Sequence, residues 1–451
     1  MLLTVMAATA LWLAGCANVA KVPAPVATNG WDQVPAILAR IVPPTFPDRD
    51  FEVTKFGARV GGEADCTAAF AAAIAACHEA GGGRVVVPAG VFLSGPIHLK
   101  SHVNLHLLDG ATIRFTTNTA AYMPPVFTRF ECIELMGYSA PIYAFEQTDI
   151  AITGKGTLDG QGEFWHRWIK QWDADIRKLV ELGRRGVPVR ERVFGEGFKL
   201  RPNFIQPVRC QNVLIEGVRV INSPMWTLNP VYCTNVTIRS VTVETDGPNT
   251  DGCDPDSCRD VLIKDCVFSN GDDCIAVKSG RDEDGRRVNI PCENVVIQNC
   301  VFKNGHGGVT MGSETAGGIR NVFAEDCHFD SPDLDMAMRF KTNPARGGYI
   351  ENIYLRNCMV KTAKYGIHIT KRYGAGVTKD GDTDPAVRNI DIRSSKFGTL
   401  TKGAIFVQGF SPDKLVTDVR IANCVFQPMK NAVTVTNAVR VEILGCTGLA
   451  Q

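Results

Sequence analysis

The chain has 451 residues, 45% of them hydrophobic and 21% charged, which is an ordinary globular composition with ample length for a core. Its 48 Lys and Arg nearly balance its 47 Asp and Glu, so no global field favours nucleic acid, and we expect no nucleic-acid partner. Any anionic ligand must be held by local charge.

The first 16 residues form an apolar stretch that ends in Leu13-Ala14-Gly15-Cys16. This pattern resembles a bacterial lipoprotein signal that is cleaved before Cys16, which then carries the lipid. No Lys or Arg precedes the apolar run, so the assigned start codon is open, and a plain secretory signal is the alternative. We therefore expect an exported protein, periplasmic or attached to the outer membrane of a bacterium, that contacts membrane only through a lipid anchor.

Residues 17–48 are rich in Ala, Val and Pro, which is typical of a linker. Residues 49–451 are expected to form one domain. Near its start, Thr67 to Ala80 carries Phe70, Ile74 and Cys77 at helical spacing and stops before glycines. A solenoid needs its first open end covered, so this segment predicts an N-terminal capping helix.

A strand motif recurs along most of the domain: Asn or Asp, apolar, any residue, apolar, then Asn or Asp, Cys, and Phe or Val. It begins at Asn212, Asn235, Asp260, Asn294, Asn321, Asn352, Asn389 and Asp418. The spacing predicts a coil of about 22–25 residues with inserted loops, as in a parallel β-helix. The repeated Asn or Asp is interpreted as a turn residue that tolerates left-handed geometry, not as a ligand set.

The sequence contains 16 Cys, several of them at one position of the repeat. These are Cys266, Cys300, Cys327, Cys358 and Cys424. A repeated position indicates an inward stack of small apolar side chains instead of a disulfide scaffold. One or two bridges remain open, with Cys253 and Cys258 as the nearest pair, and no spacing predicts a metal site.

Two insertions interrupt the repeat. In residues 164–202, Trp165, Trp168 and Trp172 lie on a helical apolar stripe, which predicts packing against the solenoid flank or, alternatively, a wall of a ligand cleft. The second insertion, residues 281–287, is charged and directly follows an acidic strand. A charged loop is usually solvated, but Arg281 is also a candidate for contact with substrate.

Two stretches one coil apart bring acidic residues together. Asn249-Thr250-Asp251-Gly252 is followed, about one turn of the coil later, by Gly271-Asp272-Asp273-Cys274. Stacked strands lie about 4.8 Å apart, so Asp251, Asp272 and Asp273 are expected to meet on one patch of one sheet. Gly271 is expected to supply the bend that turns both adjacent carboxylates outward.

Further polar residues follow on later coils. Cys266-Val-Phe-Ser-Asn-Gly-Asp272 and Cys300-Val-Phe-Lys-Asn-Gly-His306 are copies of one repeat, so His306 is expected one rung from Asp272. Continuing the spacing places Arg339 and then Tyr373 on later rungs, with Lys341 on the same strand face as Arg339.

Paired carboxylates on one face suit glycoside hydrolysis, in which one group donates a proton and another activates water. Three clustered carboxylates repel one another, so at least one pKa should be raised. His306 can tune that protonation, and Arg339 and Lys341 suit a uronate carboxylate. The alternative is a structural ladder of ion pairs.

These motifs together resemble the family 28 glycoside hydrolases, the polygalacturonases, over roughly residues 50–451, and most resemble bacterial exo-acting members. The motifs are Asn249-Thr-Asp251, Gly271-Asp272-Asp273, Gly305-His306-Gly307 and Arg339-Phe-Lys341. The resemblance implies an all-β fold, a right-handed single-stranded parallel β-helix of the pectin-lyase type. It also implies hydrolysis of α-1,4 galacturonan linkages with inversion, without a cofactor.

The resemblance also assigns roles to individual residues. Asp272 would be the general acid, Asp251 and Asp273 would activate water, and His306 would assist the acid. Substrate would be bound by Asn249, Arg339, Lys341 and Tyr373, with Arg281 added as a candidate from its position. Phe340 stands where the family usually has Ile, a conservative difference. For inversion, we expect Asp272 to stand about 6.5–9.5 Å from a carboxylate partner.

Three alternative functions remain open. A rhamnogalacturonan or xylogalacturonan hydrolase of the same family differs in loop shape. A Ca²⁺-dependent pectate lyase shares the β-helix, and Asp251, Asp254 and Asp256 would then supply oxygen ligands. A non-catalytic carbohydrate-binding solenoid would need no acid pair. The insertions at 164–202 and 281–287 favour a cleft closed at one end and therefore an exo-acting enzyme. We also expect the protein to be a monomer.

Overall fold

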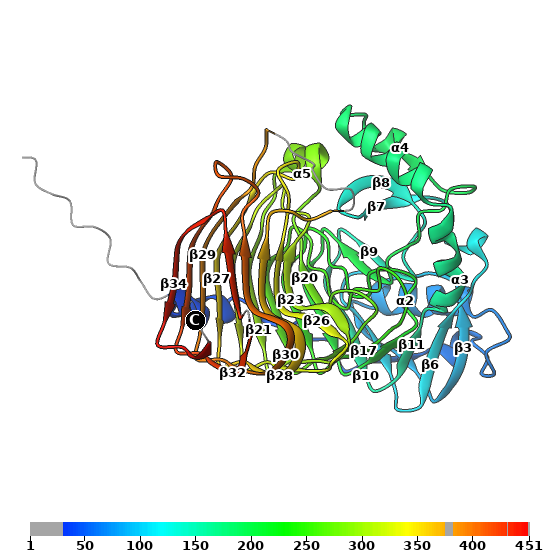
Figure 1. Cartoon of the computed structure of the whole chain (residues 1–451). Helices are drawn as coiled ribbons and strands as arrows, with labels where there is room; N and C mark the ends of the chain where they lie inside the picture. Colours follow the sequence, from blue (N-terminus) through cyan, green and yellow to red (C-terminus); the bar gives the residue numbers. More distant parts are fainter. Residues whose placement is uncertain (1–29, 375–381, 431, 450–451) are drawn as a thin grey trace, which may run out of the picture.

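The computed structural model, described for residues 30–374, 382–430 and 432–449, winds the chain into a stack of coils (Figure 1). One coil shows the plan: β18 (Arg259–Lys264) turns into β19 (Val267–Ser269), bends at Gly271, and continues as β20 (Ile275–Val277). The next coil begins with β21 (Cys292–Gln298), which pairs with β18 in parallel. The expected right-handed parallel β-helix is confirmed.

The first long sheet has 13 parallel strands. In spatial order they are β1 (Asp50–Glu52), β2 (Gly83–Val87), β5 (Val103–Leu107), β10 (Thr148–Gly154), β14 (Gln211–Glu216), β16 (Thr234–Arg239), β18, β21, β24 (Ile319–Glu325), β27 (Tyr349–Arg356), β29 (Ala386–Arg393), β31 (Val416–Ala422) and β34 (Ala438–Leu444). Each predicted repeat from Asn212 to Asp418 begins one of these strands.

The second sheet has 16 strands and includes β20, which begins just after Asp272 and Asp273. Its ordered path is β20, β23 (Gly305–Gly312), β26 (Leu334–Lys341), β28 (Met359–Thr370), β25 (His328–Asp330), β22 (Val301–Phe302), β19, β17 (Thr242–Glu244), β15 (Arg219–Ile221), β11 (Thr157–Asp159), β6 (Ala111–Phe115) and β3 (Gly90–Ser94). The strands beyond this path are β30 (Lys396–Gln408), β32 (Val425–Met429), β33 (Val433–Thr436) and β35 (Thr447–Leu449).

Two smaller sheets complete the fold. One has the order β13 (Ile205–Val208), β9 (Ile142–Phe145), β4 (Ile97–His98), and lies in the N-terminal coils. The other has the order β12 (Val193–Phe194), β8 (Ile133–Gly137), β7 (Val126–Phe130), and lies beside the solenoid in Figure 1. β7 and β8 form an antiparallel hairpin, whose turn residues Glu131 and Cys132 both have positive φ. The sequence lacks the Asn-Gly or Asp-Gly pattern that predicts such a turn, so the hairpin was not expected.

Equivalent side chains stack from coil to coil inside the solenoid. Phe268, Phe302 and Phe329 follow one another with ring centroids 5.9 and 4.7 Å apart. At the outer turn, the repeated Asn and Asp all have φ between 52° and 58°. Their side chains also bond to each other, for example Asn235 Nδ2 to Asn212 Oδ1 at 2.7 Å. The positive φ values and these hydrogen bonds between coils agree with the structural interpretation of the ladder, although Asn235 Oδ1 has no partner among the described residues because Asp260 pairs with Arg40.

The cysteines form buried columns of free thiols. The expected stack of Cys266, Cys300, Cys327, Cys358 and Cys424 is present, and a second column contains Cys210, Cys233, Cys258 and Cys292. Cys253 and Cys258, the pair left open for a bridge, are both free and buried. Burial raises the pKa of several of these thiols, for example that of Cys424 to about 12, so those groups remain protonated and apolar in character.

The N-terminal end of the core is covered by α2 (Thr67–Glu79), whose buried residues Phe70, Ile74 and Cys77 join the main hydrophobic cluster. The predicted capping helix is confirmed. The predicted linker over residues 17–48 is too long, because η1 (Gly30–Gln33) and α1 (Val34–Leu38) pack on the outer face of the long sheet. There Trp31 contacts the ring of Phe323, and an apolar contact of this size holds the segment in place.

Both insertions are folded. Residues 164–202 contain α3 (Gly162–His166), η4 (Arg167–Lys170), α4 (Asp173–Arg184), η5 (Val189–Glu191) and β12. Trp165 and Trp168 are buried among Tyr122 and Tyr138, which agrees with packing on the flank. The second insertion is the helix α5 (Asp282–Val288), not a solvated loop, and Asp282 and Asp284 are buried in it. The remaining short helical turns are η2 (Val53–Phe56) and η3 (Thr119–Tyr122).

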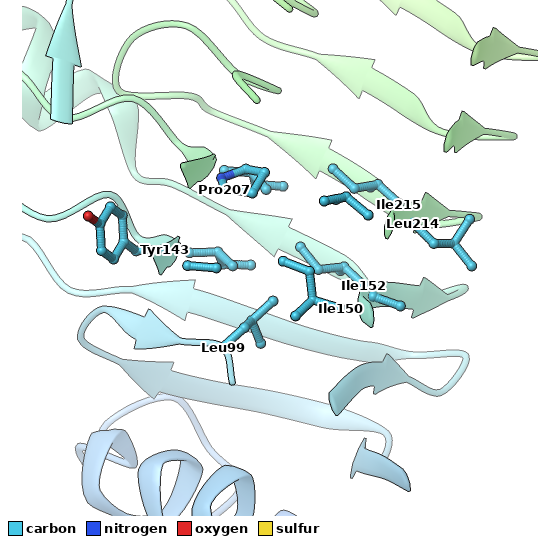
Figure 2. Close-up of a pocket in the computed structure, with 12 residues that line it drawn as sticks. Leu99, Tyr143, Ile150, Ile152, Pro207, Leu214 and Ile215 are labelled. Carbon is cyan, nitrogen blue, oxygen red and sulfur yellow. The ribbon is translucent and has the colours of Figure 1, made fainter. Parts of the chain in front are cut away.

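A small cavity lies among β9, β10, β13 and β14, and its lining is apolar (Figure 2). Leu99, Ile150, Ile152 and Ile215 point toward it. It contains none of the clustered acidic residues and is best described as a gap in core packing. None of the helices in the described residues is long and apolar enough to cross a bilayer.

Candidate active site

The three acidic residues meet where the chain enters one face of the second sheet. The backbone pairs Cys253 with Ile275, and Gly252 N–H donates to Asp273 O at 2.9 Å, which places Asp251 beside Asp273. One carboxylate oxygen from each of Asp251, Asp272 and Asp273 lies within 4.8 Å of the other two. The predicted gathering of these carboxylates is thus present in the structure.

The carboxylates are closer together than expected. A separation of about 6.5–9.5 Å is typical when two carboxylates flank opposite faces of a sugar ring. Here the nearest oxygens lie within 4.8 Å, because Asp251 and Asp273 sit on stacked coils one strand spacing apart. The expected separation is therefore wrong for these oxygens, since all three groups share one face of the solenoid.

Gly271 is needed for a reason that the sequence did not suggest. Its φ is not positive, so it does not supply a left-handed bend. A side chain on Gly271 would collide with the backbone of Gly247 on the preceding coil. This close approach lets the chain bend before β20, so that the carboxylates of Asp272 and Asp273 both join the acidic cluster instead of alternating across a regular strand.

Asp273 is the anion of a tight cluster with two cations. Its Oδ1 accepts from Arg339 Nη1 at 2.8 Å, and its Oδ2 lies 2.6 Å from Lys341 Nζ. Burial opposes ionisation, but Lys341 and Arg339 outweigh it and hold the pKa of Asp273 well below its usual range. The ring of Tyr373 lies 5.5 Å from the Arg339 guanidinium and 4.9 Å from Lys341 Nζ. The predicted cations and Tyr373 therefore lie together beside Asp273.

The register of Arg339 differs from the expected one. Arg339 pairs with Thr310 across β23 and β26, four residues beyond the position of His306. It reaches back to Asp273 by crossing Gly307, where an added Cβ would collide with Thr310 Oγ1 and stand 2.7 Å from Asp273 Oδ1 and 3.0 Å from Arg339 Cδ. Glycine at 307 thus leaves room for the ion pair. His306 itself follows the expected register, and its N–H donates to Asp272 O at 3.1 Å.

Asp272 and Asp251 have opposite electrostatic surroundings. His306 Nδ1 lies 2.9 Å from Asp272 Oδ1. Burial raises the pKa of Asp272, but this hydrogen bond and the nearby Lys341 outweigh burial, and the net pKa is lowered. The same bond raises the pKa of His306 above its ordinary value. Burial, with the charge of Asp272, raises the pKa of Asp251 to about 7. In the free site these surroundings favour protonation of Asp251 over that of Asp272, whereas the resemblance makes Asp272 the proton donor.

Asn249 is oriented by a residue that the sequence did not single out. Its Oδ1 accepts from Arg201 Nη2 at 2.9 Å, and Arg201 also donates to the carbonyls of Pro224 and Pro248. A guanidinium only donates, so the amide oxygen must face Arg201, leaving the Asn249 NH₂ group as the free donor. A donor there suits hydroxyl or carboxylate oxygens of a uronate.

Arg281 lies close to the site but is already engaged. It forms an ion pair with Glu131 at the tip of the β7–β8 hairpin, and its N–H donates to Cys132 O at 3.3 Å. Its side chain is only 12% exposed. The structure therefore shows Arg281 attaching the hairpin to the coil that carries Asp272, a contact that the expected role in substrate binding did not include.

Lys278 was also missed, although it follows the acidic strand directly. It is buried behind Asp251, at 3.7 Å from Asp251 Oδ2, and its ammonium lies 4.5 Å from the ring of Trp226. The available signal was a lysine that ends the otherwise apolar run Ile275-Ala276-Val277. A charge in such a position is rarely buried without an acidic partner.

The alternative Ca²⁺ site is not supported by the geometry. Asp256 pairs with Arg129 at 2.6 Å, and Asp254 lies 3.7 Å from Lys278 Nζ. Asp256 is therefore directed to Arg129, and Asp254 and Asp251 share the ammonium group of Lys278 where a Ca²⁺ ion would have to lie. A divalent cation among them would be repelled by Lys278 and Arg129.

Comparison with known proteins agrees with the geometry of the site. The family model described as Glycosyl hydrolases family 28 matches residues 77–441. The chain is 32% identical over 324 residues to a probable polygalacturonase of Vitis vinifera, covering 69% of this chain and 61% of that protein. It is 29% identical over 349 residues to an exo-poly-alpha-D-galacturonosidase of Dickeya chrysanthemi, covering 71% and 57%. The matches thus span less than two thirds of either relative.

The matches to solved structures cover a larger share of both chains. A hyperthermoactive exopolygalacturonase from Thermotoga maritima superposes with a TM-score of 0.88 and 39% identity, covering 93% of this chain and 95% of that one. A family 28 exopolygalacturonase of Yersinia enterocolitica has a TM-score of 0.71 at 21% identity, a likeness of fold.

Proposed function

Because the chain belongs to the glycosyl hydrolases of family 28, we propose that it hydrolyses α-1,4-linked galacturonic acid in pectin-derived polygalacturonate or oligogalacturonides. The observation that carries the proposal is the cluster of Asp251, Asp272 and Asp273 beside Arg339 and Lys341. Carboxyl groups supply the acid and base of glycoside hydrolysis, and the two cations suit the carboxylate of a uronate.

In the proposed reaction, the proton that the cluster shares passes from Asp251 to Asp272, and Asp272 gives it to the leaving glycosidic oxygen. The ionised Asp251 and Asp273 then orient and deprotonate the attacking water. His306 Nδ1 contacts Asp272 Oδ1, so a proton on His306 can pass to Asp272 as negative charge develops on the leaving group. The balance is one water consumed, one glycosidic C–O bond broken, and two sugar hydroxyl ends formed. Inversion at the anomeric carbon is part of this proposal.

The test is a product time course on polygalacturonate, oligogalacturonides and rhamnogalacturonan, with and without a chelator. We expect saturated galacturonate products on the first two substrates, unaffected by the chelator, and a β-anomer as the first product by NMR. Unsaturated products that absorb in the ultraviolet, or preference for rhamnogalacturonan, would contradict the substrate and reaction. An initial α-anomer would contradict inversion alone.

We also propose exo action, because a composite wall closes the cleft on the side of the N-terminal coils. The wall is made of the β7–β8 hairpin, α4, β12 and α5. It packs on Met225 and Trp226 in one hydrophobic cluster. Trp226 is in register with Asp251 on the preceding coil, since Leu228 pairs with Cys253. The wall therefore stands next to the acidic cluster, where it limits how far a polymer extends.

Buried ion pairs join the parts of this wall. Asp284 of α5 accepts from Arg192 Nη1 at 2.6 Å and from the N–H of Glu134 in β8 at 3.0 Å. Arg129 of β7 pairs with Asp256, two residues before Cys258 on the solenoid, at 2.6 Å. Such pairs fix relative positions, because breaking one leaves a buried charge unpaired.

The exo proposal predicts release of galacturonic acid from the non-reducing end. It is tested by following viscosity against new reducing ends on polygalacturonate. Monomer as the first product with a slow fall in viscosity is expected. A steep fall when about one per cent of bonds are cut, with mixed oligomers, would contradict a closed cleft.

We further propose a monomeric protein, exported and attached to a bacterial membrane through lipid at Cys16, which lies outside the described residues. The support is the pattern Leu13-Ala14-Gly15-Cys16 after an apolar stretch. Metabolic labelling with a fatty acid should mark the wild-type protein, and Cys16→Ser should abolish both label and membrane association. Unchanged fractionation of Cys16→Ser would contradict lipid attachment, and light scattering tests the monomer.

A further inference from the structure

A buried lysine lies directly behind the acidic cluster. Lys278 follows β20, and its side chain is 3% exposed. Its Nζ lies 3.3 Å from Glu314 Oε2, 3.4 Å from the carbonyl oxygen of Gly312, and 3.7 Å from both Asp251 Oδ2 and Asp254 Oδ1. One ammonium group therefore faces three carboxylates, only one of which belongs to the acidic cluster.

The three carboxylates do not depend on Lys278 equally. Glu314 has a second cation, Arg346, at 3.2 Å, and Arg346 also pairs with Asp282 at 2.6 Å. Asp254 is fully buried, and burial, with the charge of Asp251, raises the pKa of Asp254 well above its usual value, so this group is protonated. In the described part of the chain, Lys278 is the one cation within 4 Å of Asp251.

We propose that Lys278 is a positioning residue for Asp251: its ammonium group fixes that carboxylate at the floor of the cleft and offsets the charge of the neighbouring carboxylates. The proposal rests on the hydrolytic function proposed above. Trp226 covers the ammonium at 4.5 Å, so water does not replace this contact. Lys278 contacts no position where a sugar would react, and it acts only through Asp251.

The proposal has a consequence for the pH profile. Burial and the charge of Asp272 raise the pKa of Asp251 to about 7, and Lys278 opposes that rise. Without the lysine charge, the proton is held more tightly and leaves at higher pH. The titratable and charged groups that face this pair are Asp254, Asp272, Asp273, Glu314 and Lys341, and Arg346 and Arg281 face Glu314.

The test compares Lys278→Met, which removes the charge and keeps the length, with Lys278→Arg, which keeps the charge. For Lys278→Met we expect kcat to fall about 100-fold or more, KM to change little, and the alkaline limb of kcat/KM to move up by about one pH unit. Lys278→Arg should keep the limb at its wild-type position. A merely structural lysine would lower activity without moving the limb, and that result would overturn the proposal.

Two further measurements keep the test decisive. If Lys278→Met does not fold, the double variant Lys278→Met/Glu314→Gln removes one cation and one anion together, and its alkaline limb should still move up. Infrared titration needs no activity: the band of a protonated carboxyl should persist to higher pH in Lys278→Met than in the wild type, and vanish again when Asp251→Asn is added. An unchanged band would overturn the proposal, whereas inactivity of the wild type would contradict only the proposed function.

Discussion

Asp272 stands next to His306 at the centre of the candidate site, with its side chain mostly buried but directed to the cleft. Replacing it with Asn keeps the shape and removes the proton donor. We expect Asp272→Asn to lower kcat by about 10²–10⁴-fold while the thermal midpoint changes little. Circular dichroism melts and initial rates on polygalacturonate measure both. Asp330→Asn, which loses an exposed ion pair with Lys361, is the matched control and should keep full activity. Turnover near the wild-type rate for Asp272→Asn would refute the role.

The acidic cluster also sets a pH limit. The hydrolytic form must hold one proton among its carboxylates, and burial raises the pKa of Asp251, where the free site holds it, to about 7. The hydrogen bond to Asp272 raises the pKa of His306 in the same direction. The cluster loses this proton as pH rises through about 7, and the proton on His306 is held to a pH above its ordinary range. Because Asp272 then has no proton to donate, kcat/KM should fall on the alkaline side of about pH 7. A pH profile on a short oligogalacturonide tests this, and full activity at pH 9 would contradict it.

Gly307 makes room for an ion pair, and this leads to a sharp prediction. Gly307→Ala would push a methyl group against Asp273 Oδ1 and Arg339. We expect a stability loss of about 1–3 kcal/mol and a fall in kcat/KM of at least about tenfold. The matched control is Gly403→Ala in the same column of the sheet, where the added methyl meets only the edge of Tyr365 at 3.1 Å. If both variants lose activity equally, the ion pair does not need the space at Gly307.

The sequence alone predicted which carboxylates lie in the candidate site, but not which of them carries a proton. Asp251, Asp272 and Asp273 follow from a repeat whose copies can be counted, and His306 follows from the same copies. The proton position depends instead on burial and on Lys278, whose place behind Asp251 is set by the fold. The register of Arg339 was also wrong, because a loop between coils changed the spacing.

At the scale of elements, regular parts were predictable and irregular parts were not. The strands that begin at Asn212 through Asp418 and the helix Thr67–Glu79 carry clear periodic patterns. The β7–β8 hairpin has no turn signal, because its positive-φ residues are Glu131 and Cys132. The helix α5 is rich in charge, and its buried Asp282 and Asp284 are explained only by cations that arrive from distant segments.

Asp284 is the centre of those contacts, so it tests the wall as an element. Asp284→Asn should weaken the attachment of α5 to Arg192 and the hairpin, at a cost of about 3–5 kcal/mol if the pair is fully broken. We expect a rise in oligomer products relative to monomer on polygalacturonate. Glu283→Gln on the same helix, which loses an exposed pair with Arg286, is the control and should leave the product pattern unchanged. An unaltered monomer fraction in Asp284→Asn would show that the wall does not decide the mode of cleavage.

For the whole molecule, the stability of a solenoid is divided among neighbouring coils. The catalytic coils are covered on both sides, whereas β33 and much of β34 are exposed. Local opening is easiest where burial is least. Amide exchange should therefore be at least about 100-fold faster in β34 than in β18, measured by mass spectrometry of peptic fragments. Equal protection along the chain would indicate that the coils unfold as one cooperative unit.

The columns of buried thiols can also serve as probes of how the solenoid unfolds. Most coils from Cys210 to Cys424 place a free sulfhydryl in the interior, and burial raises the pKa of thiols such as Cys233 and Cys424, which keeps them protonated and unreactive. An alkylating reagent can reach such a group only when its coil opens. The protein thus carries its own set of chemical reporters, spaced along the axis, and the order in which they become labelled would map the sequence in which the solenoid unwinds.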